Sequence, residues 1–387
     1  MSIKVNSKEK EENFWPTELQ KLLLKAAFLE GNEAITAWKE WKSNIEFEHL
    51  DNGSRRVLPL LYRNMKRHGF ENQSEEGLRL YLQNCYYNNE LFLCILPALR
   101  SFKRAGIKIM ILKGAALVLQ YYHEYGYRVM SDVDVLVPFE QAPKAINLLD
   151  ELKWIPKFNG PEVMEKLENL SGHGHGFMNT DGGQIDLHWH ILKACCHPDA
   201  DAEFWEHALP VKMLDVSTYV LHPTDQLLHT CLHGAQCFRN LYWAADAMMI
   251  LKNSQLDIDW KRVVRQSKKL MRSLMLRDAL FFLKDVLNAP IPYSVFSNLE
   301  KLTVSKNERM EVSEIKNPSS KLGFLRNDLL QCQRYVRQSG SNGFWSKAVN
   351  SMRYFQQSWQ LKSLWTVPFY FIYRGICRIL KMILRLR

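Results

Sequence analysis

The sequence predicts an α/β (α+β) fold in which a mixed sheet is flanked along the chain by helical regions. Two observations lead to this prediction. Runs of β-branched and apolar residues are concentrated between residues 99 and 223. Before and after that segment, apolar residues recur every three or four positions, which is typical of amphipathic helices. A chain of 387 residues is long enough for two or three domains with a substantial core.

The periodicity divides the chain into four parts. We expect a helical N-terminal region at 1–98, a strand-rich core at 99–223, a helical C-terminal region at 224–328 and a basic helical tail at 329–387. Strands are expected at 107–112, 132–137, 175–179, 184–190 and 211–221, and helices at 115–123, 139–152, 240–254 and 260–288. The glycine-rich run at 171–176 predicts a mobile loop beside the sheet.

The central feature of the core is the segment V-M-S-D-V-D-V-L-V-P at 129–138. Its apolar residues are typical of a buried strand. Because side chains alternate across a strand, Asp132 and Asp134 should leave the same face. Two acids beside an apolar run are costly to bury without a cation, and a divalent metal is the usual partner. We therefore interpret this pair as metal ligands.

A second feature precedes the acidic strand. A strand-like run leads into Lys113-Gly114-Ala115 and then into a helix-like stretch. Glycine at a strand-to-helix turn lets the backbone approach a phosphate, and the first amides of the next helix point there. Lys113 and Arg128 are the cations best placed to meet phosphate oxygens, and Ser131 could donate a hydrogen bond to one. With the acidic strand, these residues predict a site for a nucleoside triphosphate.

Three segments resemble a known family. They are I-L-K-G-A-A-L at 111–117, S-D-V-D-V-L-V at 131–137 with Arg128 before it, and I-D-L-H-W at 185–189. Together they resemble the bacterial nucleotidyltransferase-family proteins of the DNA polymerase β-like superfamily. The resemblance covers about residues 55–250. It implies that the strand-rich core is a polymerase β-like nucleotidyltransferase core.

The resemblance also implies the chemistry. Asp132, Asp134 and Asp186 would be catalytic residues that hold Mg²⁺ or Mn²⁺, and Asp186 would orient or deprotonate an acceptor hydroxyl. The nucleotide-binding residues would be Lys113, Gly114, Arg128 and Ser131. An NMP group would move from an NTP to the hydroxyl, with release of pyrophosphate. We expect ATP as the donor, although nothing in the sequence selects the base. The acceptor is open among a peptide, a protein side chain, a sugar and a small molecule.

Two alternatives stay open. Several histidines with one acid could bind zinc or another transition metal, which would indicate a metal-dependent hydrolase. The members of this cluster are His173, His175, His188 and Asp186. In the nucleotidyltransferase interpretation, His188 and His175 instead face the substrate or support the metal ligands. The second alternative is a catalytically inactive nucleotide-binding scaffold, because Ala115 stands where the superfamily usually has Ser or Gly.

The excess of positive charge lies in the tail. Residues 329–387 contain ten basic residues and no acidic residue, and the rest of the chain is formally neutral. Nucleic acid is therefore a less favoured partner. An aromatic stretch at 364–373 precedes four basic residues that share one helical face, namely Arg374, Arg378, Lys381 and Arg385. We predict that residues 364–387 lie on an anionic membrane surface; the alternative is that they fold back onto the helical region.

The sequence also bears on the compartment. The N-terminus lacks the apolar core of a signal peptide, and no apolar run reaches the roughly 18 residues that a membrane span requires. Eight cysteines occur without C-x-x-C spacing, which fits a reducing compartment. We expect a cytoplasmic protein that attaches peripherally, through its tail, to the inner face of the membrane.

Overall fold

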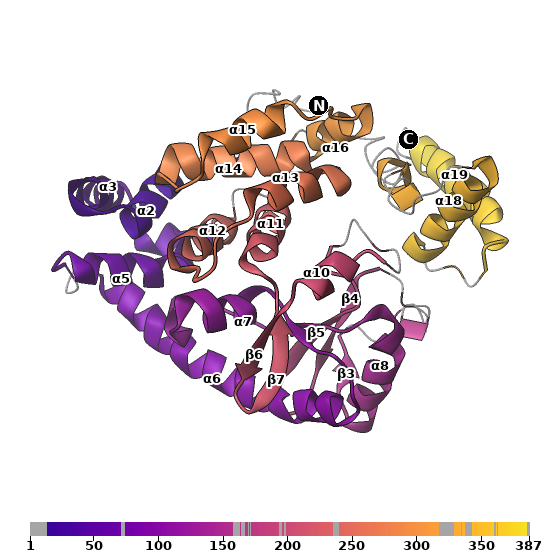
Figure 1. Cartoon of the computed structure of the whole chain (residues 1–387), viewed down its shortest axis with the longest axis horizontal. Helices are drawn as coiled ribbons and strands as arrows, with labels where there is room; N and C mark the ends of the chain where they lie inside the picture. The colour runs from indigo at the N-terminus through magenta and orange to yellow at the C-terminus, as the bar shows by residue number, and fades with distance from the viewer. Residues whose placement is uncertain are drawn as a thin grey trace.

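The computed structural model describes residues 14–70, 74–157, 163, 167–168, 170, 172–192, 196, 199–234, 240–316, 329–333, 335–336, 343–359, 361 and 363–384, without the side chains of 47, 357 and 376–384. In this part of the chain, seven strands form one mixed sheet in the order β3-β4-β5-β2-β1-β7-β6. The strands are β1 (Met110–Ile111), β2 (Val133–Leu136), β3 (Ile155–Pro156), β4 (Gly174–Met178), β5 (Gln184–His188), β6 (Leu209–Met213) and β7 (Val216–Val220). The mixed sheet among many helices confirms the predicted α/β class (Figure 1).

The sheet has two different faces because side chains alternate along β2 and β5. One face carries Val133, Val135 and Leu187, which are buried in a core with residues of two helices. These helices are α6 (Glu75–Arg104) and α8 (Ala142–Glu151). The other face carries Asp134 and Asp186. The apolar alternation therefore fixes which side of the sheet receives the acids.

The long helix α6 joins the sheet to the N-terminal helices (Figure 1). Those helices are α2 (Glu18–Phe28), α3 (Gly31–Ser43), α4 (Asn52–Arg55) and α5 (Leu58–Arg67). Two side-chain amides of α6 face the loop that leads into β2. Asn84 donates to the carbonyl of Gly126 at 3.0 Å, and Asn88 donates to the carbonyls of Tyr125 and Arg128 at 2.6 and 2.7 Å. The helix thus holds the chain just before the acidic strand.

The C-terminal helices lie on the other side of the sheet from α6 (Figure 1). They are α11 (Pro223–Gly234), α12 (Tyr242–Asn253), α13 (Trp260–Lys269), α14 (Ser273–Leu287), α15 (Tyr293–Glu300) and α16 (Lys306–Lys316). The single helix expected at 260–288 is two helices. Met271 lies between them with φ +52°, and a left-handed residue of this kind ends a right-handed helix.

Two strand predictions require correction. The mobile loop predicted at 171–176 is wrong for the described residues, because Gly174 and Gly176 lie in β4 and pair with β5. A Cβ atom on Gly174 would lie 2.6 Å from the carbonyl oxygen of Leu187, so glycine here permits a close approach of two backbones. The strand expected at 211–221 is the hairpin of β6 and β7, which turns at Leu214 with φ +54°.

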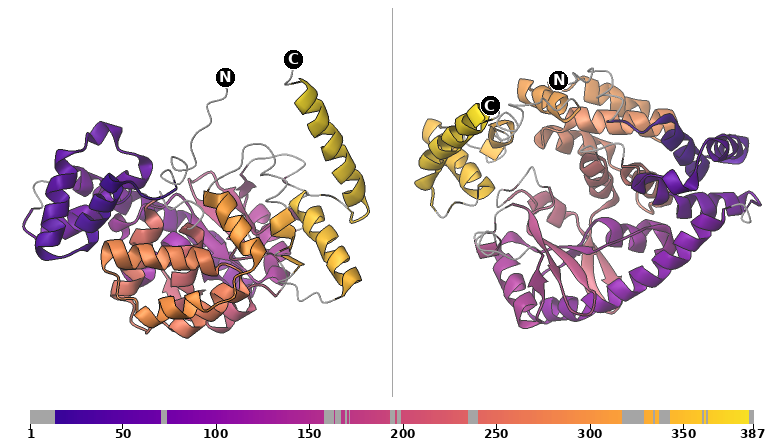
Figure 2. Two further views of the ribbon diagram at one scale, coloured as in Figure 1. Left: turned by 90° about the horizontal axis from the view of Figure 1, so that it is seen from above. Right: turned by 180° about the vertical axis from the view of Figure 1, so that it is seen from behind.

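The tail forms two helices, α18 (Phe344–Ser358) and α19 (Thr366–Leu384). They stand to one side of the sheet and the other helices (Figure 2). A small separate core, which includes Phe355 and Val367, joins them. α19 begins two residues before Pro368, which agrees with a proline in the first turn of a helix.

The aromatic side chains of the tail are partly exposed. Trp365 is 80% exposed and Phe369 is 74% exposed. Arg374 lies over the ring of Trp359, with 5.0 Å between the guanidinium carbon and the ring centroid. The other members of the predicted basic face, Arg378, Lys381 and Arg385, lie outside the described side chains. Within the described part of the chain, we find no helix whose length and apolar character would let it traverse a bilayer.

Candidate active site

Two neighbouring strands bring two acids together. β2 and β5 run parallel, and Asp134 is the register partner of Asp186. Two positions further along, Leu136 is the partner of His188. Directly paired residues of adjacent strands point to the same face of a sheet. Asp186, which the resemblance implies to be the third catalytic acid, therefore lies on the strand beside the acidic strand.

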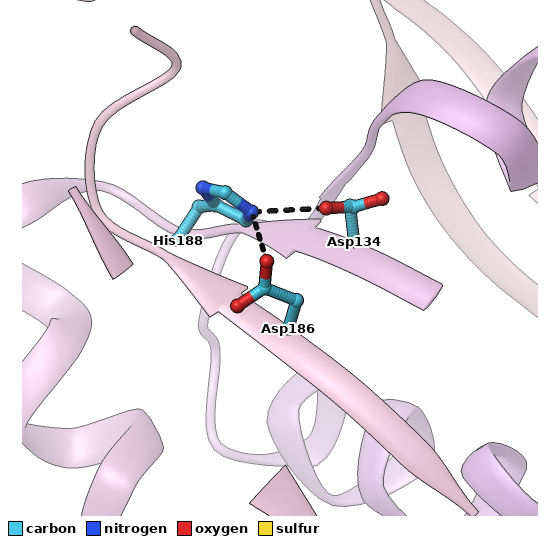
Figure 3. Close-up of side chains that lie close together, drawn as sticks. All are labelled: Asp134, Asp186 and His188. Atoms are coloured by element: carbon cyan, nitrogen blue, oxygen red, sulfur yellow. Dashed lines mark hydrogen bonds and ion pairs between the residues drawn. The ribbon is translucent and has the colours of Figure 1, made fainter. Parts of the chain in front are cut away.

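His188 lies between these acids (Figure 3). Its Nε2 atom is 3.0 Å from Oδ1 of Asp134 and 3.0 Å from Oδ2 of Asp186. Lys113 approaches the same pair, with its Nζ atom 2.6 Å from Oδ1 of Asp134 and 4.0 Å from Oδ2 of Asp186. The imidazole is completely buried. The two carboxylates are therefore matched by two basic groups.

The contacts of His188 change the protonation of all three groups. Burial alone would lower the pKa of His188, but its hydrogen bonds to Asp134 and Asp186 raise that pKa to about 9. Burial would raise the pKa of each acid, yet the hydrogen bond from His188 and the charge of Lys113 hold the pKa of Asp134 and of Asp186 below the usual range. At neutral pH and without a metal, the group is an imidazolium between two carboxylates.

Asp132 lies just before β2 and faces the same space. Ser131 donates from its hydroxyl to Oδ1 of Asp132 at 3.2 Å, and Nζ of Lys157 lies 3.7 Å from Oδ2. Burial and the nearby charge of Asp134 raise the pKa of Asp132. A cavity of about 410 Å³ is lined by Asp132, Asp134 and Asp186. The structure thus brings the three predicted catalytic acids into one cavity.

The strand-to-helix turn differs in detail from the expectation. Lys113, rather than Gly114, has the left-handed backbone, with φ +46°, and it begins α7 (Lys113–Leu117). A Cβ atom on Gly114 would lie 2.9 Å from Cγ of Met130, so this glycine allows the turn to pack against the segment before β2. Ala115 points away from the cavity into the core beside α6 and is 1% exposed. A π-helical turn, Val118–Tyr122, follows α7.

Arg128 lines the cavity but has a partner of its own. Its Nε and Nη2 atoms donate to Oδ1 and Oδ2 of Asp246 at 2.8 and 2.9 Å. The hydroxyl of Tyr122 donates to the same acid at 2.7 Å. Burial would lower the pKa of Arg128, but the charge of Asp246 raises it. This buried pair joins the segment before β2 to α12, and the predicted contact of Arg128 with nucleotide stays a prediction.

The structure does not gather the four members of the predicted hydrolase cluster. His175 pairs with Leu187, so it leaves the opposite face of the sheet from Asp186, and its Nε2 atom lies 2.8 Å from the carbonyl oxygen of Lys157. The ring of His173 does lie near His188, with 5.1 Å between centroids. His190, which a regular strand would place beside His188, follows the end of β5 and bonds to Asp201.

One group of side chains could hold a metal ion. Among the described residues, it consists of Asp134, Asp186 and His188, with one ligand atom from each within 4.8 Å of the others. Two carboxylates and an imidazole suit Mn²⁺ or another transition metal, whereas Mg²⁺ prefers oxygen ligands such as Asp132, Asp134 and Asp186. The donor set therefore fits the divalent ion that the resemblance implies.

Comparison with known proteins decides the family. A family described as uncharacterised nucleotidyltransferase matches residues 53–288, which is more than half of the chain. The protein belongs to this nucleotidyltransferase family. The resemblance inferred from three short segments is thereby confirmed at the level of the family.

Among solved structures, this nucleotidyltransferase-family protein is similar to a fungal protein. It is an antigenic nucleotidyltransferase-like protein from Paracoccidioides brasiliensis, with 14% sequence identity and a TM-score of 0.36. The similarity covers 54% of this chain and 97% of the other. No curated protein matches the sequence.

The sequence analysis does not identify the residues that the helical regions contribute to the cavity. Arg56, His229 and Tyr242 line it, and all three lie outside the predicted core. The i, i+4 spacing of His229 and His233 puts both on one face of α11, and this signal is visible in the sequence. Arg56 follows a short helix in a region without any motif, so no sequence signal marks it.

Proposed function

We propose that this protein moves an NMP group from a nucleoside triphosphate to a hydroxyl acceptor and releases pyrophosphate. The observation that carries the proposal is the convergence of Asp132, Asp134 and Asp186 on one cavity in a member of a nucleotidyltransferase family. The three acids would hold Mg²⁺ or Mn²⁺, which supplies the positive charge that offsets the triphosphate and the leaving pyrophosphate. Lys113 adds a fixed positive charge beside Asp134.

Asp186 is assigned to the acceptor. His188 holds the pKa of Asp186 low, so this carboxylate is a weak base and accepts a hydrogen bond more readily than a proton. Its role is to orient the hydroxyl for in-line attack. The new bond joins the acceptor oxygen to the α-phosphorus while the bond to pyrophosphate breaks, and water takes up the hydroxyl proton. The acceptor class stays open among a peptide, a protein side chain, a sugar and a small molecule.

Labelled nucleotides test this proposal directly. The full-length protein is incubated with Mg²⁺ and each α-labelled NTP, ATP first, together with candidate acceptors of the four classes. Pyrophosphate release with transfer of the α-label supports the proposal, and Asp134→Asn serves as the inactive control. Release of inorganic phosphate, or turnover that survives in Asp134→Asn, contradicts it.

Elemental analysis separates the metal assignments. Mg²⁺ binds weakly without its phosphate partner, so the purified protein is expected to carry no stoichiometric zinc and to need millimolar Mg²⁺ or Mn²⁺ for turnover. One zinc per chain that disappears in His188→Ala would instead favour the hydrolase alternative.

We also propose that the tail binds an anionic membrane surface from the cytoplasmic side. Exposed Trp365 and Phe369 lie in a segment that contains basic but no acidic residues, and this combination suits the interface of a charged bilayer. Sedimentation with anionic or neutral vesicles at low salt tests it. Wild-type protein should pellet with anionic vesicles, and Trp365→Ser/Phe369→Ser should not. The control is Tyr293→Ser, which removes a 78% exposed aromatic residue from α15. Wild-type protein that stays in the supernatant contradicts the proposal.

A further inference from the structure

The helical side of the cavity holds an arginine on a tyrosine. Arg56 follows α4, and its guanidinium carbon lies 4.7 Å from the ring centroid of Tyr242. The same ring contacts the guanidinium of Arg128, whose carbon lies 4.0 Å from the centroid. Both arginines and the tyrosine line the cavity that contains the three acids. One aromatic ring therefore supports two cations at this site.

The two cations differ in their partners. Arg128 gives two of its donors to Asp246. Among the described residues, the side chain of Arg56 makes no hydrogen bond or ion pair, and its contact in the cavity is the ring of Tyr242. A guanidinium has five N–H donors in one plane. Those of Arg56 are available to a ligand in the cavity, and stacking on Tyr242 restricts the orientations of that plane.

The charges around the cavity indicate what Arg56 would bind. On the sheet side, Asp134 pairs with Lys113 and Asp132 lies near Lys157. Among the described residues, no acid lies within ion-pair distance of Arg56, because Asp246 on this side of the cavity is paired with Arg128. A planar guanidinium fits two oxygens of one phosphate group, and that geometry binds more strongly than a point charge. Phosphate is therefore the ligand chemistry that the arrangement favours.

A second side chain of this wall also lacks a partner. His229 is 2% exposed and lines the cavity, and neither of its ring nitrogens has a hydrogen-bond partner among the described residues. Burial and the neighbouring His233 hold its pKa far below the ordinary value, so the ring is neutral and carries one N–H donor. A buried donor without a partner costs free energy unless a ligand completes it. The wall thus presents a cation and a neutral donor to the same space.

We propose that Arg56 binds the terminal phosphates of the nucleoside triphosphate. The inference rests on the proposed function, because the α-phosphorus is taken to lie at the acids. The triphosphate then extends from the acids on the sheet to Arg56 on the helical wall, and the leaving pyrophosphate is held at Arg56. This residue makes the cavity selective for triphosphates over monophosphates.

Calorimetric binding to the full-length protein tests the assignment. The probes are ATP, inorganic pyrophosphate and AMP, each with Mg²⁺. Arg56→Gln should weaken the binding of ATP and of pyrophosphate by about tenfold or more and change that of AMP by less than about twofold. Arg56→Lys keeps the charge but loses the planar fork, so an intermediate loss is expected. The matched control is Arg63→Gln, since Arg63 lies 5.5 Å over the ring of Tyr127 but lines a different cavity.

The outcomes separate this inference from the proposed function. Unchanged ATP and pyrophosphate affinity in Arg56→Gln overturns it, and so does an equal loss for all three probes. A wild-type protein that binds neither pyrophosphate nor any of the four NTPs overturns both proposals. Selective loss in Arg56→Gln, together with wild-type protein that transfers no NMP to any acceptor, supports the phosphate site and rejects the transfer reaction. NMP transfer with normal binding by Arg56→Gln rejects the phosphate site alone.

Discussion

The two walls of the cavity differ in whether their charged and polar side chains are paired within the protein. On the sheet wall, Asp134 is paired with Lys113, Asp186 with His188, and Asp132 lies near Lys157. On the helical wall, the side chains of Arg56 and His229 have no hydrogen-bond or ion-pair partner among the described residues, although Arg56 stacks on Tyr242. Charges that pair within the protein hold one another in place, whereas polar groups left unpaired lower stability until a ligand arrives. We therefore propose that the sheet wall carries the chemistry and that the helical wall recognises the ligand.

The largest effect is expected from the ion pair of Arg128 and Asp246, which joins the two walls. Asp246→Ala leaves the buried guanidinium of Arg128 without its acid, and such a loss is expected to lower the free energy of unfolding by about 3–5 kcal/mol. Urea denaturation of purified protein measures it. The double variant Arg128→Met/Asp246→Leu removes both charges and should recover most of the loss. A single variant as stable as the wild type would show that the pair does not join the walls.

The second test removes one charge from the sheet wall. Asp134→Asn should leave the protein folded but lower turnover by at least about a hundredfold, the scale expected when a metal ligand is lost. Initial rates with saturating nucleotide measure the effect. Asp201→Asn is the matched control, because Asp201 is also buried and bonded to a histidine, His190, but does not line the cavity. Comparable losses of turnover in the two variants would mean that the loss comes from disturbed folding and not from the removal of a metal ligand.

Asp186→Asn distinguishes the roles of the acids on the same wall. Because Asp186 is assigned to the acceptor, kcat should fall by about tenfold or more while the Kd of the nucleotide changes little. Steady-state kinetics with equilibrium binding provide both values. The assignment fails if nucleotide binding is lost and turnover is kept.

On the helical wall, a substitution of His229 is expected to change stability by a smaller amount than Asp246→Ala and in the opposite direction. His229→Leu replaces a buried, unpartnered imidazole by an apolar side chain of similar size, so the protein without ligand should gain about 1 kcal/mol of stability. The same change at His190, which is equally buried but bonded to Asp201, should cost stability. Thermal or urea unfolding of both variants gives the comparison. If both variants were destabilised by the same amount, the claim that His229 is an unsatisfied polar group and His190 a paired one would be wrong.

The smallest effect is expected at Ala115. The side chain of Ala115 lies in the core beside α6. Ala115→Ser therefore buries a hydroxyl group without bringing it to the cavity. Turnover should change by less than about twofold, and stability should fall by about 1 kcal/mol. An increase in turnover of tenfold would show that the missing hydroxyl limits the reaction, as the scaffold alternative assumes.

The sequence predicts the sheet wall better than the helical wall for a physical reason. Alternation along a strand and a short motif locate Asp132 and Asp134, and the register of β5 then brings Asp186 beside them. The partner of Arg128 is Asp246, and 118 positions separate them in the chain, so no local pattern connects the two. Contacts of that kind depend on how helices pack on the sheet, which periodicity alone does not determine.

The errors in the core have local causes. Glycine is usually a sign of a turn, yet in β4 it is the residue whose lack of a side chain lets two strands approach. The strand expected at 184–190 ends at His188, and His190 beyond it bonds to Asp201 instead of continuing the alternation. His175 could not be assigned to a face before the pairing of β4 with β5 was known.

The π-helical turn at Val118–Tyr122 makes the contact between Tyr122 and Asp246 depend on the number of residues in this segment. A π turn contains about one residue more than an α turn, so it is equivalent to a single insertion in an ordinary helix. A further one-residue insertion or deletion that this turn did not absorb would rotate Tyr122 by about 100°, away from Asp246. The hydrogen bond to the buried acid would then be lost. Among relatives, we therefore expect this segment to vary in sequence more freely than in length.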